Sequence, residues 1–173
     1  MTEKKERIIK TALKLFAEEG YGATSTSKVA RDAGVSEGLI FRHFENKEGL
    51  LKAIIAIGEE KIKSLFTDII HQSDPKIIIK NALEMPISVI ESEYEFWRLQ
   101  YKLKWELKEY NDKRMEPLKL SLTNAFKKLG YESPDHEASL VLLIIDGMAS
   151  ALLKGTMTDK KEFSQFLLKK YNL

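Results

Sequence analysis

Hydrophobic residues recur along most of the chain at intervals of three and four positions, the spacing that places side chains on one face of an α-helix. The longest such patterns cover residues 4–19, 47–71 and 134–154. Alternation of apolar and polar residues over several positions, which would predict a half-buried strand, is not found. The pattern therefore predicts an all-α protein of about nine helices.

Residues that begin and end helices locate the first half of these elements. Gly20 ends the first helix, and Asn46 can cap the long helix that starts at Lys47. At ~1.5 Å per residue the long helix would span about 40 Å, and Gly58 is the weak point at which it could bend. Asp74 and the residues after it then open a helix over Asp74–Ser92.

The second half of the chain divides in the same way. Pro86 should kink the Asp74–Ser92 helix, because proline has no N–H to donate. Ser133 can cap the most apolar helix, and Asp159 with Glu162 has the spacing of a capping box. The remaining helices are predicted over Glu93–Tyr110, from about Asn111–Pro117 to Leu129, Pro134–Lys154 and Asp159–Tyr171.

Residues 24–47 read as two short helices joined by a tight turn. Thr24 or Ser25 can cap the first helix, since a hydroxyl accepts a bond from a free backbone N–H. Gly34 ends that helix, because glycine enters the left-handed conformation without steric cost. Ser36 can cap the second helix.

The apolar positions of this segment also fit two packed helices. They are Val29, Ala30, Ala33, Val35 and Ile40, with Phe41 or Phe44 completing the buried side. Ala30 is small enough to keep the helices close, and the glycine turn lets them cross steeply. Together they specify a helix-turn-helix, whose second helix would enter the DNA major groove. An ordinary corner between two helices uses the same chemistry without binding DNA, so spacing alone leaves both readings open.

The run TSTSKVARDAGVSEGLIFRHFENKEGLL, preceded by EEGYGAT, resembles the DNA-binding domain of the TetR family of bacterial transcriptional repressors. The resemblance covers roughly Lys5–Leu51 and includes the Gly20-Tyr21 pair, the AGVS turn, the His43-Phe44 pair and Lys47. It implies a helix-turn-helix domain over residues 1–46 and a helical effector-binding and dimerisation domain over residues 47–173. The roughly 120 residues outside the match carry no family motif, as expected of variable effector domains.

The predicted recognition helix, Glu37–His43, offers several groups to DNA. Arg42 can pair with a guanine edge or a phosphate, and Leu39 can contact a thymine methyl. Glu37 either accepts a bond from cytosine N4 or serves the helix N-terminus as a negative charge. The resemblance implies DNA contacts for Thr26, Ser36, Gly38, Phe41, His43 and Lys47. The full predicted DNA-binding set is Ser25, Thr26, Ser36, Glu37, Gly38, Leu39, Phe41, Arg42, His43 and Lys47.

The sequence departs from the family at Phe41. The family usually has a tyrosine there, whose hydroxyl reaches a phosphate. Phenylalanine has no hydroxyl, so that contact cannot form, and Phe41 could instead be packed inside.

An aromatic segment indicates a candidate effector pocket. Trp97, Tyr101 and Trp105 recur every four residues and so share one helix face. Methionines suit a pocket that adapts to its ligand. The predicted pocket residues are Met85, Trp97, Gln100, Tyr101, Trp105, Met115, Phe126, Asp146 and Met148, and the ligand would be hydrophobic or amphipathic. An aromatic core without a ligand is the alternative, and Asp146 is read first as a buried structural bridge.

The last two helices are the predicted homodimer interface, as the family usually has. Gly147 and Ala151 are four residues apart and would let two helices approach closely, although packing within one subunit would use them equally well. The predicted interface set is Leu140, Leu143, Ile144, Gly147, Ala151, Phe163, Phe166 and Leu167.

Composition narrows the function further. A chain of 173 residues with 43% hydrophobic and 31% charged residues is typical of a core-forming soluble protein. It has no cysteine, no apolar run of the ~18 residues that a membrane helix needs and no signal peptide, so a cytoplasmic protein without membrane contact is expected.

Charge argues against a protein that coats nucleic acid without sequence preference. The net charge is only +2, and the first 50 residues hold nine Lys or Arg and eight Asp or Glu. Attraction to DNA must then come from the placement of single cations, namely Lys28, Arg31, Arg42 and Lys47.

No catalytic motif or metal-ligand spacing accompanies the three histidines, so neither an enzyme nor a cofactor is expected. The sequence thus predicts a homodimeric regulator that binds operator DNA and is expected to act as a repressor released by a ligand. The alternatives are a regulator without a ligand pocket and a helical small-molecule-binding protein that does not bind DNA.

Overall fold

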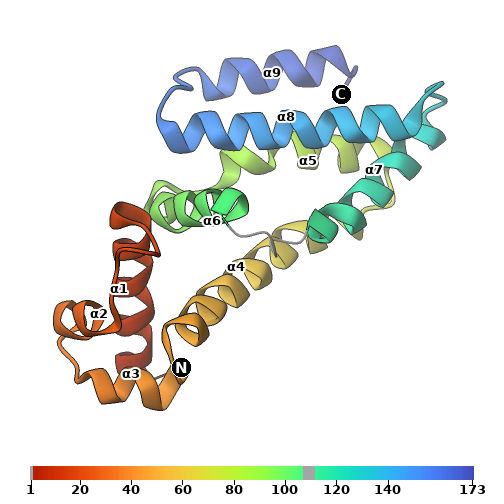
Figure 1. Ribbon diagram of the computed structural model, residues 1–173. Coiled ribbons are helices and arrows are strands. Elements are labelled where there is room, and N and C mark those ends of the chain that lie inside the picture. The colour runs from red at the N-terminus through yellow and green to blue at the C-terminus, as the bar shows by residue number, and fades with distance from the viewer. Residues whose placement is uncertain (1, 107–111) are drawn as a thin grey trace. The chain divides into compact units, whose positions relative to one another are not determined.

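A computed structural model describes residues 2–106 and 112–173 (Figure 1). Over these residues the chain forms nine α-helices, two short 3-10 helices and no strand, which confirms the all-α prediction. The elements are α1 (Glu3–Glu19), α2 (Thr26–Ala33), α3 (Glu37–Phe44), α4 (Lys47–Ile70), α5 (Pro75–Ser88), η1 (Glu91–Glu93), α6 (Tyr94–Glu106), η2 (Asp112–Met115), α7 (Glu116–Lys128), α8 (Pro134–Lys154) and α9 (Lys160–Lys170).

The helices gather into two compact units, and α4 belongs to both. The first unit comprises Met1–Lys61 and Ser92–Tyr110, and the second comprises Ile62–Glu91 and Asn111–Leu173. The aromatic helix α6 thus joins the first unit, where it packs against α1. This division follows contacts between residues. The functional division at residue 47 concerns binding and stays a prediction.

The core of the first unit is built from four helices of the N-terminal segment and from α6. Ile8 and Phe16 of α1, Ile40 of α3 and Ile54 of α4 are fully buried in it. Leu99 of α6 joins the same cluster and exposes only 1% of its surface. A helix some 50 positions away in sequence therefore completes the core that supports α2 and α3.

Gly58 lies where α4 meets α6 within the first unit. A methyl group built on Gly58 would lie 2.6 Å from Nε2 of Gln100, whose side chain is buried. Glycine therefore leaves room for the Gln100 amide at this close approach. The sequence indicated a possible bend here, whereas α4 runs as one helix through this position. One turn further on, Lys61 forms an ion pair with Glu93 and lies over the ring of Phe96, with Nζ 5.7 Å from the centroid.

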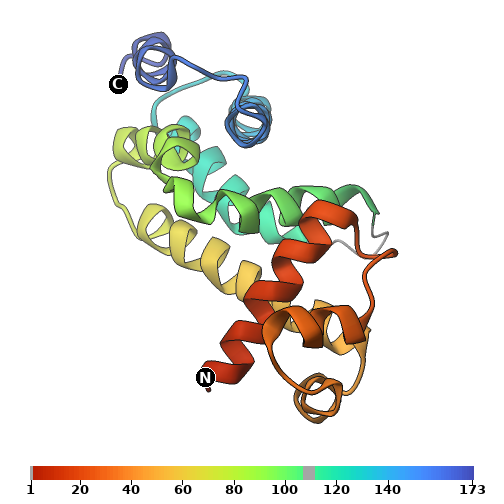
Figure 2. The ribbon, with the colours of Figure 1, turned by 90° about the vertical axis from the view of Figure 1, so that its left-hand side faces the viewer.

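The second unit packs α5, α7 and α8 side by side, with α9 against α5 (Figure 2). Leu118, Leu122 and Phe126 of α7 are fully buried in its core. Tyr171, just past α9, lies against Phe126 with the ring centroids 5.7 Å apart, and its hydroxyl donates to Glu137 over 3.4 Å. Burial, followed by the negative charge of Glu137, raises the pKa of Tyr171 to about 12.

Helix boundaries follow the predicted capping chemistry only in part. Ser25, Asn46 and Asp74 accept backbone N–H bonds as expected, at 3.2, 2.8 and 2.8 Å. Ser133 and Asp159 occupy N-cap positions without a side-chain bond, so the predicted capping box at Asp159 is wrong. The Asp159 carboxylate instead accepts from the adjacent Thr158 hydroxyl.

Proline limits α5 more than predicted. Pro86 is buried in the last turn, and α5 ends at Ser88, four residues before the predicted end. Pro86 has no N–H to donate to the Ala82 carbonyl, and α5 ends two residues after it.

Among the described residues, α8 is long and apolar enough by composition to cross a membrane. The expectation was that no apolar run reaches the ~18 residues that a membrane helix needs, and α8 meets that length by its composition. One such helix is weak evidence for a membrane, because core helices of soluble proteins can have the same composition.

We predict a strong energetic coupling between Gly58 and Gln100. Gly58→Ala should destabilise the wild-type protein by about 1–3 kcal/mol, because the methyl group overpacks a buried contact. In a Gln100→Ala background the same substitution should stabilise the protein, since alanine favours a helix by ~1 kcal/mol over glycine. Urea denaturation of the four proteins measures the coupling. Additive effects of the two substitutions would contradict the contact.

Candidate nucleic-acid interface

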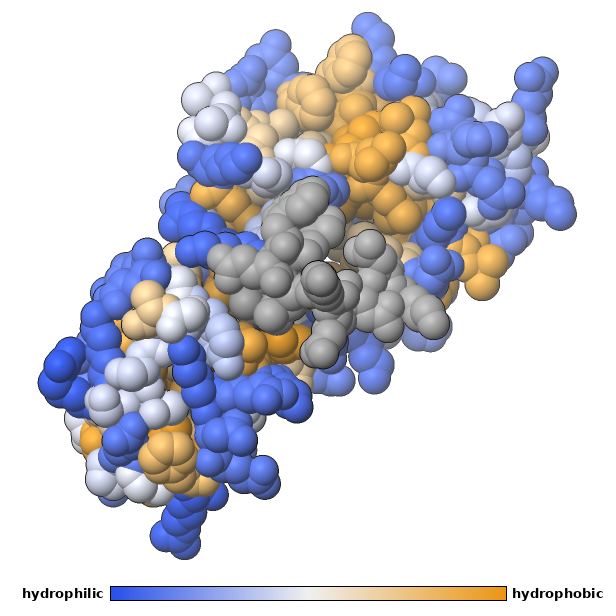
Figure 3. Space-filling model, viewed as in Figure 1, coloured by the Kyte–Doolittle hydropathy of each residue, from blue (hydrophilic) through white to orange (hydrophobic). Residues whose placement is uncertain are grey.

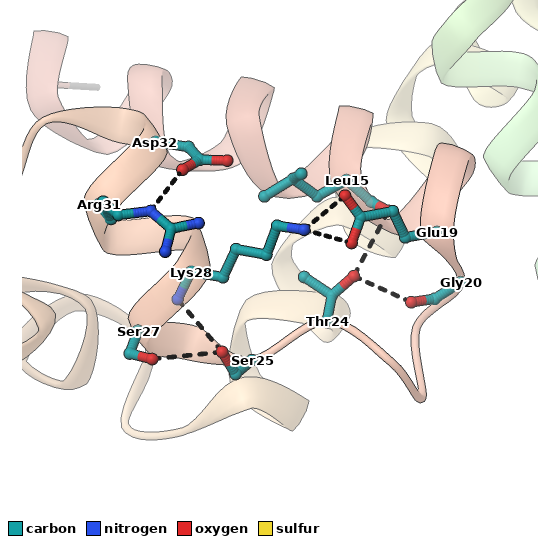
Figure 4. Close-up of polar contacts among 9 residues, drawn as sticks. All are labelled: Leu15, Glu19, Gly20, Thr24, Ser25, Ser27, Lys28, Arg31 and Asp32. Atoms are coloured by element: carbon teal, nitrogen blue, oxygen red, sulfur yellow. Dashed lines mark hydrogen bonds and ion pairs between the residues drawn. The ribbon is translucent and has the colours of Figure 1, made fainter.

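The segment that leads into α2 is fixed by a buried threonine (Figure 4). The Thr24 hydroxyl donates to the Gly20 carbonyl over 3.0 Å and lies 3.4 Å from the Leu15 carbonyl, so it ties this segment to the end of α1. Thr24 is 1% exposed. Of the two predicted caps, Ser25 is thus the one that forms, by accepting from the N–H of Lys28.

The turn between α2 and α3 has the geometry that its glycine predicted. Gly34 has φ 63° and ψ 42°, and its N–H bonds to the Ala30 and Arg31 carbonyls. The N–H of Val35 also bonds to the Ala30 carbonyl, over 3.0 Å. Paired bonds of this kind satisfy carbonyls that would otherwise lack partners at a helix end. Ser36 begins α3 without a side-chain cap, contrary to the prediction.

Helix α3 presents one buried and one exposed side. Ile40 and Phe44 are buried, at 0% and 5% exposure. Phe41 is 45% exposed, so the reading in which Phe41 is packed inside is wrong. Gly38 and Arg42 are exposed beside it, and a methyl group on Gly38 would meet nothing within 4 Å. Glu37, Leu39 and His43 are half-buried at the edges of this face.

The four cations expected to attract DNA differ in their surroundings. Lys28 is paired with Glu19 at 2.6 Å and Arg31 with Asp32 at 3.1 Å, so these acids offset both charges (Figure 4). Arg42 is exposed and forms no ion pair within the part of the chain that the structure describes.

Lys47, the first residue of α4, is held in place by the loop between α1 and α2. Its Nζ lies 4.4 Å from the centroid of the Tyr21 ring and donates to the Gly22 carbonyl over 3.3 Å. Burial, with the charge of Glu48 as the second cause, raises the pKa of Tyr21, which keeps its hydroxyl protonated near neutral pH. The ring therefore offers Lys47 a neutral aromatic face.

A hydrogen bond links the first residues of α2 and α3. The Thr26 hydroxyl donates to Oε1 of Glu37 over 2.7 Å, in a partly buried setting. Both residues belong to the predicted DNA-binding set, and their contact was not predicted. Thr26 therefore already has a hydrogen-bond acceptor within the protein.

Gly49 is a second residue that the sequence reasoning missed. A methyl group on Gly49 would lie 1.9 Å from the Phe44 carbonyl oxygen, so no other residue fits the tight α3–α4 turn without a backbone shift. Glu45 in the same turn adopts a positive φ of 66°. The available signal was a glycine within the first turn of a predicted helix, where glycine is otherwise unfavourable.

The predicted pocket residues fall in both units. Trp97, Gln100 and Tyr101 belong to the first unit, and the side chain of Trp105 lies outside the described residues. In the second unit, Phe126 and Met148 are buried in the core, and Met85 and Met115 pack partly buried against it. Asp146 is half-exposed and has an interaction partner, so it is not the buried carboxylate that was expected. The pocket itself stays a prediction.

Trp97 has a buried hydrogen-bond donor without an acceptor among the described residues. Trp97 exposes only 8% of its surface, and the donor is its indole Nε1. Its ring contacts Phe96 edge-to-face, with centroids 5.2 Å apart. A buried donor without a partner costs about 1–3 kcal/mol, so this group favours an additional acceptor.

Four of the eight predicted interface residues are exposed apolar side chains on α8 and α9, where Figure 3 shows apolar surface. Leu143 and Phe166 expose 70% and 60% of their surface, and Leu140 and Phe163 about 40%. Gly147 is exposed, and Ile144 and Ala151 are half-buried. Leu167 is different, because it is buried in the core of its own chain and is not available to a partner.

Comparisons with known proteins match the N-terminal segment to one family. Residues 8–54 match the family described as bacterial regulatory proteins, tetR family. The uncharacterized HTH-type transcriptional regulator YerO of Bacillus subtilis (strain 168) is 38% identical over 87 residues, which cover 48% of this chain and 30% of that protein. The chain thus spans about a third of the length of this curated relative.

Solved structures share the fold over nearly the whole chain. A transcriptional regulator from Rhodococcus sp. Rha1 aligns with a TM-score of 0.74 at 20% identity, over 96% of this chain and 92% of that one. A transcriptional regulator from Saccharomonospora viridis, solved in complex with choline, aligns with a TM-score of 0.72 at 17% identity, over 98% and 97% of the two chains. At these identities the likeness supports the fold alone.

Proposed function

Since residues 8–54 match the TetR family of bacterial regulatory proteins, we propose that this chain is a cytoplasmic transcriptional repressor that binds operator DNA as a homodimer. The observation that carries the proposal is the exposed face of α3. Gly38, Phe41 and Arg42 point away from a core that holds the same helix through Ile40. A recognition helix needs this division, because one side must stay anchored while the other contacts base edges.

Within the DNA complex, Arg42 is the principal reader of sequence and Lys47 the principal phosphate ligand. Among the described residues Arg42 pairs with no acid, so it can pair with guanine O6 and N7. Lys47 stands at the positive end of α4, where its ammonium group and free backbone N–H groups attract the same phosphate. Phe41 contributes an apolar contact, for which a thymine methyl is the matching surface. Because the net charge is small, these placed groups carry most of the affinity.

The homodimer forms through the exposed apolar residues of α8 and α9. Leu140, Leu143 and Gly147 follow one face of α8 at helical spacing, and Phe163 and Phe166 add two rings from α9, 6.1 Å apart. Large exposed apolar side chains that lie together mark association surfaces. A two-fold dimer then presents two copies of α3 to half-sites about one helical turn, ~34–36 Å, apart.

Repression is relieved by a hydrophobic or amphipathic ligand that binds at the aromatic face of α6. Trp97 supports this, because its indole N–H needs an acceptor that a ligand can supply. Helix α6 also contributes Leu99 to the core beneath α3, so a ligand that favours another position of α6 would change the support of the recognition helix. A neighbour of the same fold was solved with choline, a small organic molecule. A regulator without a ligand is the alternative.

Arg42→Ala should weaken operator binding by about 1–3 kcal/mol and relax the preference at one position per half-site. Lys47→Ala should weaken binding to all sequences alike and reduce the salt dependence by about one unit of slope. Lys52→Ala is the matched control, because this exposed lysine of α4 is already paired with Glu48. Selection of binding sequences from random DNA and titrations at several salt concentrations measure both effects. If the Arg42 and Lys47 variants bound operator DNA as wild type does, the assignment of α3 as the recognition helix would be wrong.

Gly147→Leu should separate the subunits and reduce operator affinity, although the DNA-binding helices are untouched. A Cβ atom at this exposed position would meet nothing within 4 Å among the described residues, so the monomer should fold normally. Asn124→Leu, which places a leucine at an exposed position of α7 outside the proposed interface, should remain dimeric. Sedimentation velocity at micromolar concentration gives the oligomeric state. A monomeric wild type would refute the homodimer.

Binding of an effector should change tryptophan emission, because Trp97 and Trp105 are the only tryptophans of the chain. The change should occur over the same ligand concentrations that release operator DNA. Straight-chain fatty acids and quaternary ammonium compounds are suitable first probes. Trp97→Phe keeps an aromatic ring but removes the hydrogen-bond donor. About tenfold more ligand should then be needed to release operator DNA. No emission change across the panel would favour the regulator without a ligand.

A further inference from the structure

The carboxylate of Glu37 differs from several other acids of the first unit in having no cationic partner among the described residues. Glu19, Asp32, Glu48 and Glu93 each pair with a lysine or arginine. Glu37 forms no ion pair among the described residues. It accepts instead from the neutral hydroxyl of Thr26, which leaves its negative charge uncompensated.

The Thr26 bond also fixes where this charge lies. Glu37 is the first residue of α3 and Thr26 the first residue of α2, so one short bond of 2.7 Å orients the carboxylate against both helices. Both groups are half-buried, which limits the other positions that the side chain can adopt. The bond uses Oε1, and Oε2 remains for a further donor. A residue at the start of a recognition helix lies where base edges are contacted.

Only some groups of DNA can accommodate such a charge. Phosphates repel it, and guanine presents two acceptors in the major groove. Cytosine presents the N4 amino group as a donor, whereas adenine places its N6 donor beside the N7 acceptor, which would repel the second carboxylate oxygen. We propose that Glu37 reads a cytosine in each half-site through Oε2, and that Thr26 is the positioning residue that orients it.

This inference rests on the proposed DNA-binding function and adds one base to what the protein recognises. It also gives Thr26 a new role, since a hydroxyl that donates to Glu37 does not donate to a phosphate. A charge that served only the helix N-terminus would stabilise α3 but give no preference for any base.

The test selects binding sequences from random double-stranded DNA with the full-length wild type and three variants. Wild type should select cytosine at one position of each half-site. Glu37→Gln should replace that cytosine by adenine and leave the other positions unchanged, because glutamine pairs with adenine N6 and N7. Its affinity for the wild-type operator should fall by about tenfold. Thr26→Val should keep the same sequence but select it less sharply at that one position.

Glu45→Gln is the matched control, because it removes the same charge from the exposed residue that follows the other end of α3. It should select the wild-type sequence with uniformly higher affinity, and thermal melting should show all variants folded. The inference would be overturned if Glu37→Gln selected the same consensus sequence as wild type. It would also be overturned if Thr26→Val lost affinity equally for all sequences and showed a weaker dependence of affinity on salt. In either case the proposed DNA binding would still stand. A wild type that selects no sequence would refute the proposed function itself.

Discussion

An eight-residue helix is not stable in water on its own, so α3, the proposed recognition helix, depends on burial against its neighbours. Ile40 and Phe44 supply that burial for α3, in a core built mainly by α1 and α4. The core is small, so each of its contacts matters for the angle at which α3 is held. Thr24 and Gly49 serve the same end, the first by tying α2 to the end of α1 and the second by allowing the tight turn into α4.

The same constraint extends to α6, which is distant in sequence. Leu99 completes the core under α3, and Gln100 fills the space that Gly58 leaves on α4. The aromatic helix that is the proposed ligand site is therefore also a structural part of the DNA-binding unit. Ligand binding could then change DNA affinity without a chain of intermediate residues within this unit, because α6 contributes both to the proposed ligand site and to the core under α3.

Only a few charged groups are available to interact with DNA. Several surface cations are paired with acids, as Lys28 is with Glu19, and these pairs contribute little to DNA attraction. The groups proposed to contact DNA are few and fixed in position: Arg42 is exposed, Lys47 lies against Tyr21, and Glu37 is held by Thr26. A protein with a net charge of +2 gains specificity from such groups, because it cannot rely on bulk attraction to the phosphates.

The sequence by itself determined the local structure: helical periodicity, the Gly34 turn and the capping residues Ser25 and Asp74 are short-range chemistry. It also indicated the family that residues 8–54 match, since the helix-turn-helix motif is contiguous. Tertiary structure alone decided that Phe44 rather than Phe41 is buried, because both positions suit the helix and only the neighbours differ. The Thr26–Glu37 bond, the Gly58–Gln100 contact and the burial of Leu167 likewise join residues whose proximity depends on how whole helices pack, which no local pattern encodes.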